Sequence, residues 1–237
     1  MRIAVLALSL LVVACNSDID EPWQLAHDRI IAVRATPPRI LPGEQAKLDV
    51  LLGYDAMPVE ERSPDLAAVI SPESMTDAMA IDAGDWVVTA PSEERLAAAR
   101  EELKLPAGSP VPLQVGVAVT WPYPVMSPDG RTFGAAKTVW LGESGTNPEL
   151  VGLTINGVPP GDELVVPKDT EVRLYVEADD TMDIVNWLTS CGVMHDFDLH
   201  SAYLTVAPED PQEGELVLVL RDPRGGVTWR IWPIRAE

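Results

Sequence analysis

Apolar and polar residues alternate along much of the chain. The stretch QAKLDVLL, residues 45–52, places its apolar side chains at even positions and Lys47 and Asp49 between them. The stretch EVRLYVEA, residues 171–178, repeats this alternation, with apolar residues at the even positions and Glu171, Arg173 and Glu177 on the opposite face. A period of two is typical of strands with one buried face. Both stretches are therefore predicted to be half-buried β-strands.

The surroundings of these two strands are also similar. Each follows another apolar strand and a turn-rich connection, in residues 29–44 and 150–169 respectively, and each is followed by an acidic turn. This similarity indicates a weak internal repeat of a two-strand opening unit. The polar, turn-forming stretch GESGTNP, residues 142–148, is the expected boundary. We expect one domain over residues 23–142 and a second over 147–237.

The second domain shows a regular succession of short strands. They are expected in DIVNWLT, HSAYLTVAP, ELVLVLRD and VTWRIWPI, the last two joined by a turn in RDPRGG. Pro223 fixes φ in that turn and the glycines supply positive φ. About seven short strands at near-regular spacing predict an antiparallel β-sandwich.

The first domain contains an additional segment between residues 54 and 110. Ser92 is a good N-cap, helix formers follow, and Pro106 ends the run, so a helix is predicted near 92–105. Its apolar face, with Leu96, Ala99 and Leu103, is expected to cover the sandwich. Beyond it, residues 111–121 and 132–141 are expected to pair as a hairpin.

Particular residues of the second domain resemble a known class. Trp187, Ser190 and Gly192 form a W-x-x-S-x-G pattern, and a closing RD-x-x-GG hairpin follows. This combination resembles bacterial immunoglobulin-like and PKD-like domains, although paired core cysteines are absent. The resemblance implies a mainly β protein of two tandem immunoglobulin-like antiparallel β-sandwiches, the first with a helical insertion. The whole chain resembles lipoproteins of high-GC Gram-negative bacteria that carry such domains in tandem.

The N-terminus resembles a lipoprotein signal peptide. Arg2 precedes a twelve-residue run, 3–14, in which Ser9 is the only polar residue, and Cys15 follows. The run is too short to span a bilayer, which takes about 20 apolar residues. By resemblance to the lipobox, Cys15 is expected to carry lipid and to begin the mature chain. The alternative is an ordinary signal peptide cut after residue 14, with Cys15 incidental.

A lipid on Cys15 would define the location of the protein. Residues 15–22 are polar and acidic, as expected of a tether, and two or three acyl chains hold a protein durably at a membrane. Asn16 follows the cysteine, where aspartate favours inner-membrane retention in some Gram-negative bacteria. We therefore expect a lipid-anchored protein of the cell envelope, in the outer rather than the inner membrane.

Composition restricts the partners. The formal net charge is −20, and −21 without residues 1–14, which disfavours nucleic acid and anionic lipid headgroups as partners. Hydrophobic residues make up 46% of the chain, enough for a large core. If Cys15 is acylated, Cys191 has no partner for an intrachain disulfide, and it is expected to be a small buried apolar residue.

Two clusters could bind a divalent cation. The first is CGVMHDFDLHS, in which Asp196, Asp198 and His200 would share one face if the segment were extended, with His195 beside them. Such a set suits zinc or manganese. Its spacing matches no standard metal motif, and a solvated connection is the favoured alternative.

The second cluster is an acidic turn, EADDTMD. It contains Glu177, Asp179, Asp180 and Asp183, and some immunoglobulin-like families hold calcium with clustered carboxylates at such turns. Aspartates also form turns without any metal, and this alternative is favoured.

Aromatic residues are the remaining binding candidates. Trp121 and Tyr123 lie at the tip of the hairpin predicted in the first domain, and Trp232 is expected to point opposite to Trp229. Exposed aromatics can stack on sugars or enter a protein interface. The favoured alternative is that Trp121 closes the first core and Trp232 meets the other domain.

Motifs of common enzyme classes are absent from the sequence, including G-x-S-x-G, H-E-x-x-H and the P-loop. The first hypothesis is therefore a non-enzymatic envelope lipoprotein, with no cofactor beyond its lipid, that binds an envelope protein or polysaccharide. The alternatives are a metal-dependent enzyme centred on the histidine segment and a calcium-stabilised adhesin.

Overall fold

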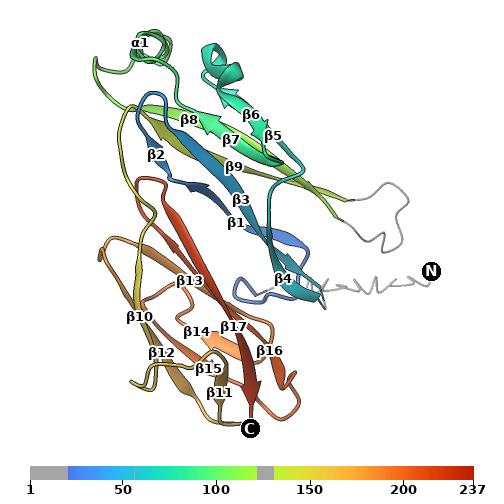
Figure 1. The fold of residues 1–237 in the computed structure, drawn as a ribbon. Helices are drawn as coiled ribbons and strands as arrows, with labels where there is room; N and C mark the ends of the chain where they lie inside the picture. Colours follow the sequence, from blue (N-terminus) through green and yellow to red (C-terminus); the bar gives the residue numbers. More distant parts are fainter. Residues whose placement is uncertain (1–20, 56, 122–130) are drawn as a thin grey trace, which may run out of the picture.

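The computed structural model describes residues 21–55, 57–121 and 131–237. These residues form two β-sandwiches, one above the other in Figure 1. Within the described residues, no helix is long and apolar enough to cross a membrane. The prediction of a mainly β, tandem immunoglobulin-like chain is confirmed.

The first sandwich consists of a five-stranded and a four-stranded sheet. The five-stranded sheet has the order β1-β3-β7-β6, with β4 also paired to β3, and contains β1 (Arg29–Thr36), β3 (Gln45–Tyr54), β4 (Met57–Arg62), β6 (Met79–Asp82) and β7 (Asp85–Thr89). The four-stranded sheet has the order β2-β9-β8-β5 and contains β2 (Arg39–Ile40), β5 (Leu66–Ser71), β8 (Val111–Thr120) and β9 (Thr132–Leu141).

The second sandwich consists of two four-stranded sheets. One has the order β10-β12-β15-β14 and contains β10 (Leu150–Ile155), β12 (Val172–Ala178), β14 (Val193–His195) and β15 (Ser201–Thr205). The other has the order β11-β17-β16-β13 and contains β11 (Leu164–Val166), β13 (Ile184–Thr189), β16 (Glu213–Arg221) and β17 (Val227–Ala236).

The two opening units share a topology as well as a sequence pattern. In each sandwich, the first strand pairs antiparallel with the third, β1 with β3 and β10 with β12. The short strand between them crosses to the other sheet and pairs parallel with the last strand, β2 with β9 and β11 with β17. The longer connection in the second copy therefore spans the same crossover.

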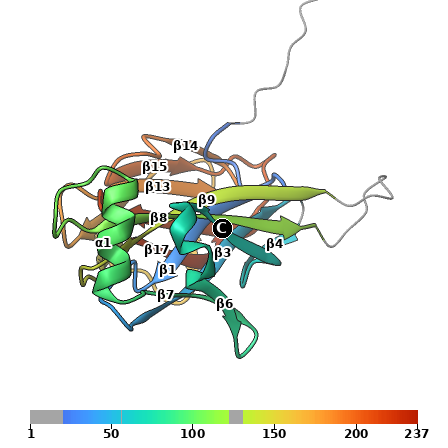
Figure 2. The same ribbon diagram turned by 90° about the horizontal axis from the view of Figure 1, so that it is seen from above.

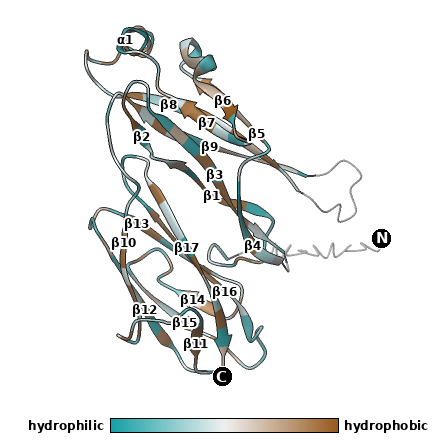
Figure 3. Ribbon diagram, in the orientation of Figure 1, coloured by the Kyte–Doolittle hydropathy of each residue, from teal (hydrophilic) through white to brown (hydrophobic). Residues whose placement is uncertain are grey.

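Alternation along the strands builds one core in each sandwich, as can be followed in Figure 3. The even-numbered apolar residues 46, 48, 50 and 52 all enter the first core, and residues 172, 174 and 176 enter the second. The predicted hairpin of residues 111–121 and 132–141 is the antiparallel pair β8 and β9.

Two helices lie at the end of the first sandwich that is distant from the second (Figures 1 and 2). The α-helix α1, Glu93–Glu102, confirms the predicted helix, and the 3₁₀ helix η1, Glu73–Ala78, lies beside it. Leu96 and Ala99 are fully buried in the first core, with Leu103 packed against it. The helix thus covers one end of the sandwich, as its apolar face required.

The beginning of the described chain corrects the expected first-domain boundary. Trp23 packs in the core of the second sandwich, although the sequence placed it in the first. Thr189 of β13 donates its N–H to the carbonyl of Trp23 at 2.8 Å and accepts from the N–H of Leu25 at 2.9 Å. The segment therefore extends the edge of the second sandwich before the chain enters β1. The indole of Trp23 is buried beside β13, an edge strand of the second sandwich. The residues around Trp23 carry no pattern that identifies this distant strand as its neighbour.

Candidate functional site

Two candidate residues, Cys15 and Tyr123, lie outside the described residues. The other cysteine, Cys191, is a free thiol that is 2% exposed in the second core. Burial raises the pKa of this thiol, and its sulfur lies 3.8 Å from the Thr189 hydroxyl. A protonated, buried thiol is unreactive, so Cys191 is a core residue in this structure.

The histidine segment is not extended, which removes the premise of a shared face. Strand β14 ends at His195, Asp196 has φ of 55°, and the N–H of Leu199 donates to the carbonyl of Asp196 at 3.0 Å. The exposed Asp198 lies within this turn. His200 instead points to the backbone carbonyl of Asp183, 3.2 Å from Nε2.

In the acidic turn, aspartate side chains accept hydrogen bonds from backbone N–H groups, as expected of turn-forming residues. Asp180 accepts from the N–H of Met182 at 2.9 Å, and Asp179 accepts from the N–H of Glu149 at 3.2 Å. Glu177 is exposed on β12. Throughout the part of the chain that the structure describes, no three His, Cys, Asp or Glu side chains are grouped so that they could hold a metal ion.

Asp183 differs from its neighbours because it is 5% exposed and neither carboxylate oxygen has a hydrogen-bond partner. Burial, followed by repulsion from Asp179 and Asp180, raises the pKa of this carboxyl to about 6. An unpaired carboxylate in this position is costly for the fold when it is ionised.

The tryptophan candidates are core residues rather than exposed binding groups. Trp121 is 6% exposed in the first core, with ring centroids 4.4 Å from Tyr54 and 4.9 Å from Phe133. Trp232 is 2% exposed in the second core. The expectation that Trp232 meets the other domain was wrong, since Trp229 does so. Trp229 and Trp232 do point to opposite faces of β17, as expected. The face that meets the first sandwich, however, is the one that carries Trp229.

The two sandwiches share a third hydrophobic cluster, which we call the junction core. It joins the outer face of the β1-β3-β4 region to the outer face of β13, β16 and β17. Its buried members are Leu25, Ala32, Leu51, Leu188, Val217, Val219, Val227 and Trp229. On β16, residues 217 and 219 face the junction while 216, 218 and 220 face the second core. This strand is therefore buried on both faces.

Polar contacts surround Trp229 within the junction. Its indole Nε1 donates to Glu61 at 2.8 Å, and the Arg34 guanidinium stacks 4.0 Å from the ring centroid. Arg34 also pairs with Asp49 at 3.3 Å and with Glu61. Asp49 is 8% exposed, so its carboxylate is largely removed from water. The guanidinium of Arg34 balances the negative charge of this buried carboxylate.

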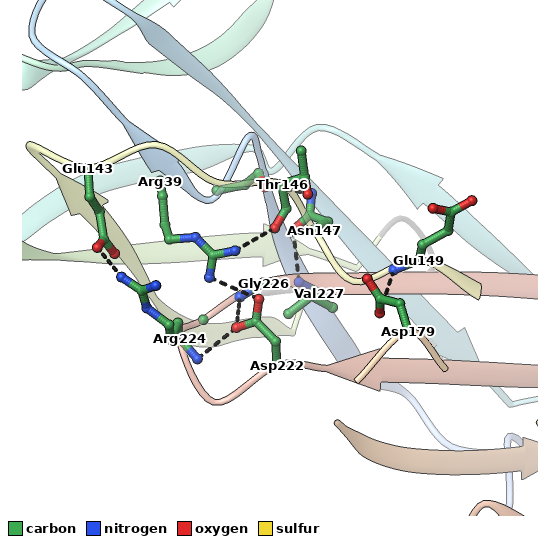
Figure 4. Close-up of polar contacts among 12 residues, drawn as sticks. Arg39, Glu143, Thr146, Asn147, Glu149, Asp179, Asp222, Arg224, Gly226 and Val227 are labelled. Carbon is green, nitrogen blue, oxygen red and sulfur yellow. Dashed lines mark hydrogen bonds and ion pairs between the residues drawn. The ribbon is translucent and has the colours of Figure 1, made fainter. Parts of the chain in front are cut away.

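At the other end of the junction, the turn between β16 and β17 contacts the first sandwich through polar side chains (Figure 4). Asp222 accepts from the N–H groups of Arg224 and Gly226, both at 2.7 Å, and its second oxygen pairs with Arg39 at 3.0 Å. A Cβ at position 226 would lie 2.3 Å from the Asp222 carboxylate, so any other residue there would displace this carboxylate. Arg224 in turn pairs with Glu143.

The segment between the sandwiches is held on both sides. Asn147 donates to the carbonyl of Ala35 at 3.0 Å and accepts from the N–H of Val227 at 2.9 Å (Figure 4). Arg39 also donates to the carbonyl of Thr146 at 2.9 Å. The connection is therefore part of the junction rather than a free linker.

Lys137 is a further junction residue. It is 6% exposed at a core-facing position of β9, and its Nζ donates to the carbonyl of Gly225. Burial lowers the pKa of its ammonium to about 8, against the attraction of Asp222. It lines a cavity of about 330 Å³ together with Arg221, whose guanidinium donates to the carbonyl of Ile31 at 3.1 Å.

A larger cleft opens where the β3–β4 end of the first sandwich meets the ends of β16 and β17. It has a volume of about 690 Å³. The apolar part of its wall includes Tyr54, Pro58, Pro233 and Ile234, with Ala26 from the N-terminal segment. The carboxylates that line it are Asp55, Glu163, Glu213 and Glu215, and none of its described lining residues is Lys, Arg or His.

The cleft is held by contacts on both walls. Glu215 of β16 accepts from the N–H of Val59 of β4 at 2.6 Å, which joins the sandwiches directly. Glu215 donates its own N–H to the Ser190 hydroxyl at 2.7 Å and accepts from the N–H of Ser190 at 3.0 Å. A Cβ at Gly214 would lie 2.3 Å from that hydroxyl. Burial raises the pKa of Glu215.

Comparisons with known proteins concern the architecture. No family model matches the sequence, and no curated protein matches it. Among solved structures, the tandem Ig repeats of Dlar match 87% of this chain and 97% of theirs, with 11% identity and a TM-score of 0.34. The fibronectin(III)-like modules of Clostridium thermocellum CbhA match 87% and 94%, with 13% identity and a TM-score of 0.31. Murine CEACAM1b matches 87% and 100%, with 10% identity and a TM-score of 0.29.

Proposed function

We propose that the chain is a lipid-anchored, non-enzymatic binding module of a bacterial cell envelope, with the cleft between its sandwiches as the binding surface. The observation that carries this proposal is the junction, because it holds two sandwiches in one arrangement and forms a preorganised cleft at their edge. Rigid surfaces of this kind bind with little ordering cost. The expected partner is a protein or polysaccharide of the envelope.

The position of Trp23 determines where a lipid on Cys15 would hold the protein. Cys15 precedes Trp23 by eight positions, and Trp23 is fixed in the second core. An extended chain of that length reaches about 28 Å. A lipid on Cys15 would therefore keep the junction and the cleft near the membrane surface.

Metabolic labelling with radioactive palmitate tests the anchor. The wild-type chain should be labelled and should accumulate as a precursor when the lipoprotein signal peptidase is blocked. The Cys15→Ala variant should lose the label, whereas Cys191→Ala, the matched control for the other cysteine, should keep it. An unlabelled wild-type protein that is cut normally would contradict the anchor.

A further inference from the structure

We infer that the cleft binds an extended basic peptide segment of a partner protein, one that combines lysine or arginine with proline or other apolar residues. This inference rests on the proposed function in taking the cleft as the binding surface, and it adds the chemistry of the ligand. Its basis is the combination of an apolar wall, an acidic rim and contributions from both sandwiches.

The apolar wall suits a peptide rather than a small ion. Tyr54 and three prolines, Pro58, Pro211 and Pro233, line the cleft, which is large enough for several side chains. The Tyr54 ring is 4% exposed and its hydroxyl donates to Glu60, while burial raises its pKa to about 12. Its hydroxyl therefore stays neutral, and the ring supports the wall from the first core. The exposed surface that a ligand would meet is that of the three prolines, and rigid proline surfaces pack on prolines and aliphatic stems at low entropic cost.

The rim determines the sign of the ligand's charge. Asp55, Glu163 and Glu213 are exposed around the cleft, and Glu215 is half-buried within it. Arg235 is the cation nearest to these carboxylates among the described residues: it lies 3.4 Å from Glu163, stands opposite Glu213 in the β16–β17 ladder and also pairs with Glu237, so one guanidinium faces three carboxylates. A basic ligand would complement the remaining charge, and charge complementarity of this kind speeds association and excludes acidic competitors.

The same charge argues against occupants from the chain itself. The segment before Trp23 contains Asp18, Asp20 and Glu21, so it would be repelled from an acidic cleft. A second copy carries a net charge of −20 and would be repelled as well. A basic segment from a different protein would be attracted to the acidic cleft and not repelled by it.

Fluorescence anisotropy with the full chain in detergent tests the inference. The probe is a fluorescein-labelled decapeptide of alternating lysine and proline, compared with glutamine–proline and glutamate–proline decapeptides. We expect saturable binding of the lysine peptide, at least tenfold weaker binding of the glutamine peptide, and none of the glutamate peptide. Binding should also weaken as salt increases.

Matched variants separate the cleft from general attraction to an acidic protein. Asp55→Asn with Glu213→Gln should weaken binding of the lysine peptide about tenfold, because each exposed charge contributes modestly. Glu94→Gln with Glu101→Gln removes the same charge from the exposed face of α1 and should leave the affinity unchanged. Equal losses in the two double variants, or no loss in the first, would overturn the inference.

Different results would contradict the basic ligand and the lipid anchor. Equally tight binding of the glutamine and lysine peptides, lost in a variant with Pro58→Ser and Pro211→Ser, would overturn the basic ligand and leave the cleft as a binding surface. Loss of palmitate labelling would remove the anchor without affecting any of these affinities.

Discussion

The indole N–H of Trp229, on the last strand of the second sandwich, donates a hydrogen bond of 2.8 Å to the carboxylate of Glu61 in the first. The same ring packs in the junction core and carries the stacked guanidinium of Arg34. One side chain thus combines apolar burial, a charged hydrogen bond and a cation–π contact across the junction. Trp229 therefore joins the two sandwiches by contacts of three different kinds.

Trp229→Ala should lower the free energy of unfolding by about 3–5 kcal/mol, the range for removing a buried aromatic side chain. Trp229→Phe keeps most of the packing and should cost about 1–2 kcal/mol, the net contribution of one hydrogen bond to an exposed carboxylate that keeps its pair with Arg34. Urea denaturation followed by circular dichroism measures both. An alanine variant within 1 kcal/mol of wild type would show that the junction contributes little.

Asp222→Ala should loosen the turn between β16 and β17 and its contact with the first sandwich. The change removes the acceptor for two backbone N–H groups and the partner of Arg39, so we expect a loss of about 2–4 kcal/mol. Asp210 accepts from the N–H of Ala207 at 2.8 Å in a turn of the second sandwich, and Asp210→Ala is the control. Hydrogen exchange should rise around Arg39 in the first variant alone. Equal exchange in both would contradict the role of Asp222.

Lys137 should give the junction a dependence on alkaline pH. Its pKa is about 8 in the folded protein and 10.5 as the ordinary value, so the unfolded chain holds more protons between these limits. Stability from this group therefore rises with pH from about 8 to about 10.5, by at most about 3 kcal/mol. Lys137→Met should lack that rise when both proteins are denatured in urea across this range. Parallel profiles would contradict the burial of the ammonium.

Asp183→Asn should stabilise the protein above pH 6. The folded carboxyl, with its pKa raised to about 6, holds a proton that the unfolded carboxyl has already lost, so stability from this group falls as pH rises from about 4 to 6. The amide variant removes this fall. The exposed Asp198→Asn is the control. A melting temperature that changes with pH in the same way in wild type and Asp183→Asn would contradict it.

The sequence predicted what depends on local alternation. The faces of residues 45–52 and 171–178, the helix near 92–105 and the pairing of β8 with β9 all follow from patterns within a few residues. Sequence alone also indicated the repeat, whose common crossover the structure shows. Each of these features depends only on residues of one sandwich and could be predicted without the other.

A contact between the domains was expected through Trp232, but the residues that form the junction were not identified, because their patterns can be interpreted only when a second sandwich is considered. The run LVLVL in β16, residues 216–220, is apolar at five successive positions, a pattern of strands buried on both faces. Lys137 occupies an inward position of β9, where a charge requires a partner. The continuous apolar run and the inward lysine both belong to the surface between the two sandwiches. The cleft has no local signature, since its walls come from segments far apart in sequence.

Residual dipolar couplings of backbone amides, measured on the full chain in dilute aligned medium, test the central claim that the two sandwiches form one rigid unit. We predict a single alignment tensor that fits the amides of both sandwiches in the arrangement of Figure 1, and two different tensors in the Trp229→Ala variant. Two tensors in the wild-type protein would show that the sandwiches move independently, and the cleft between them would then have no fixed shape.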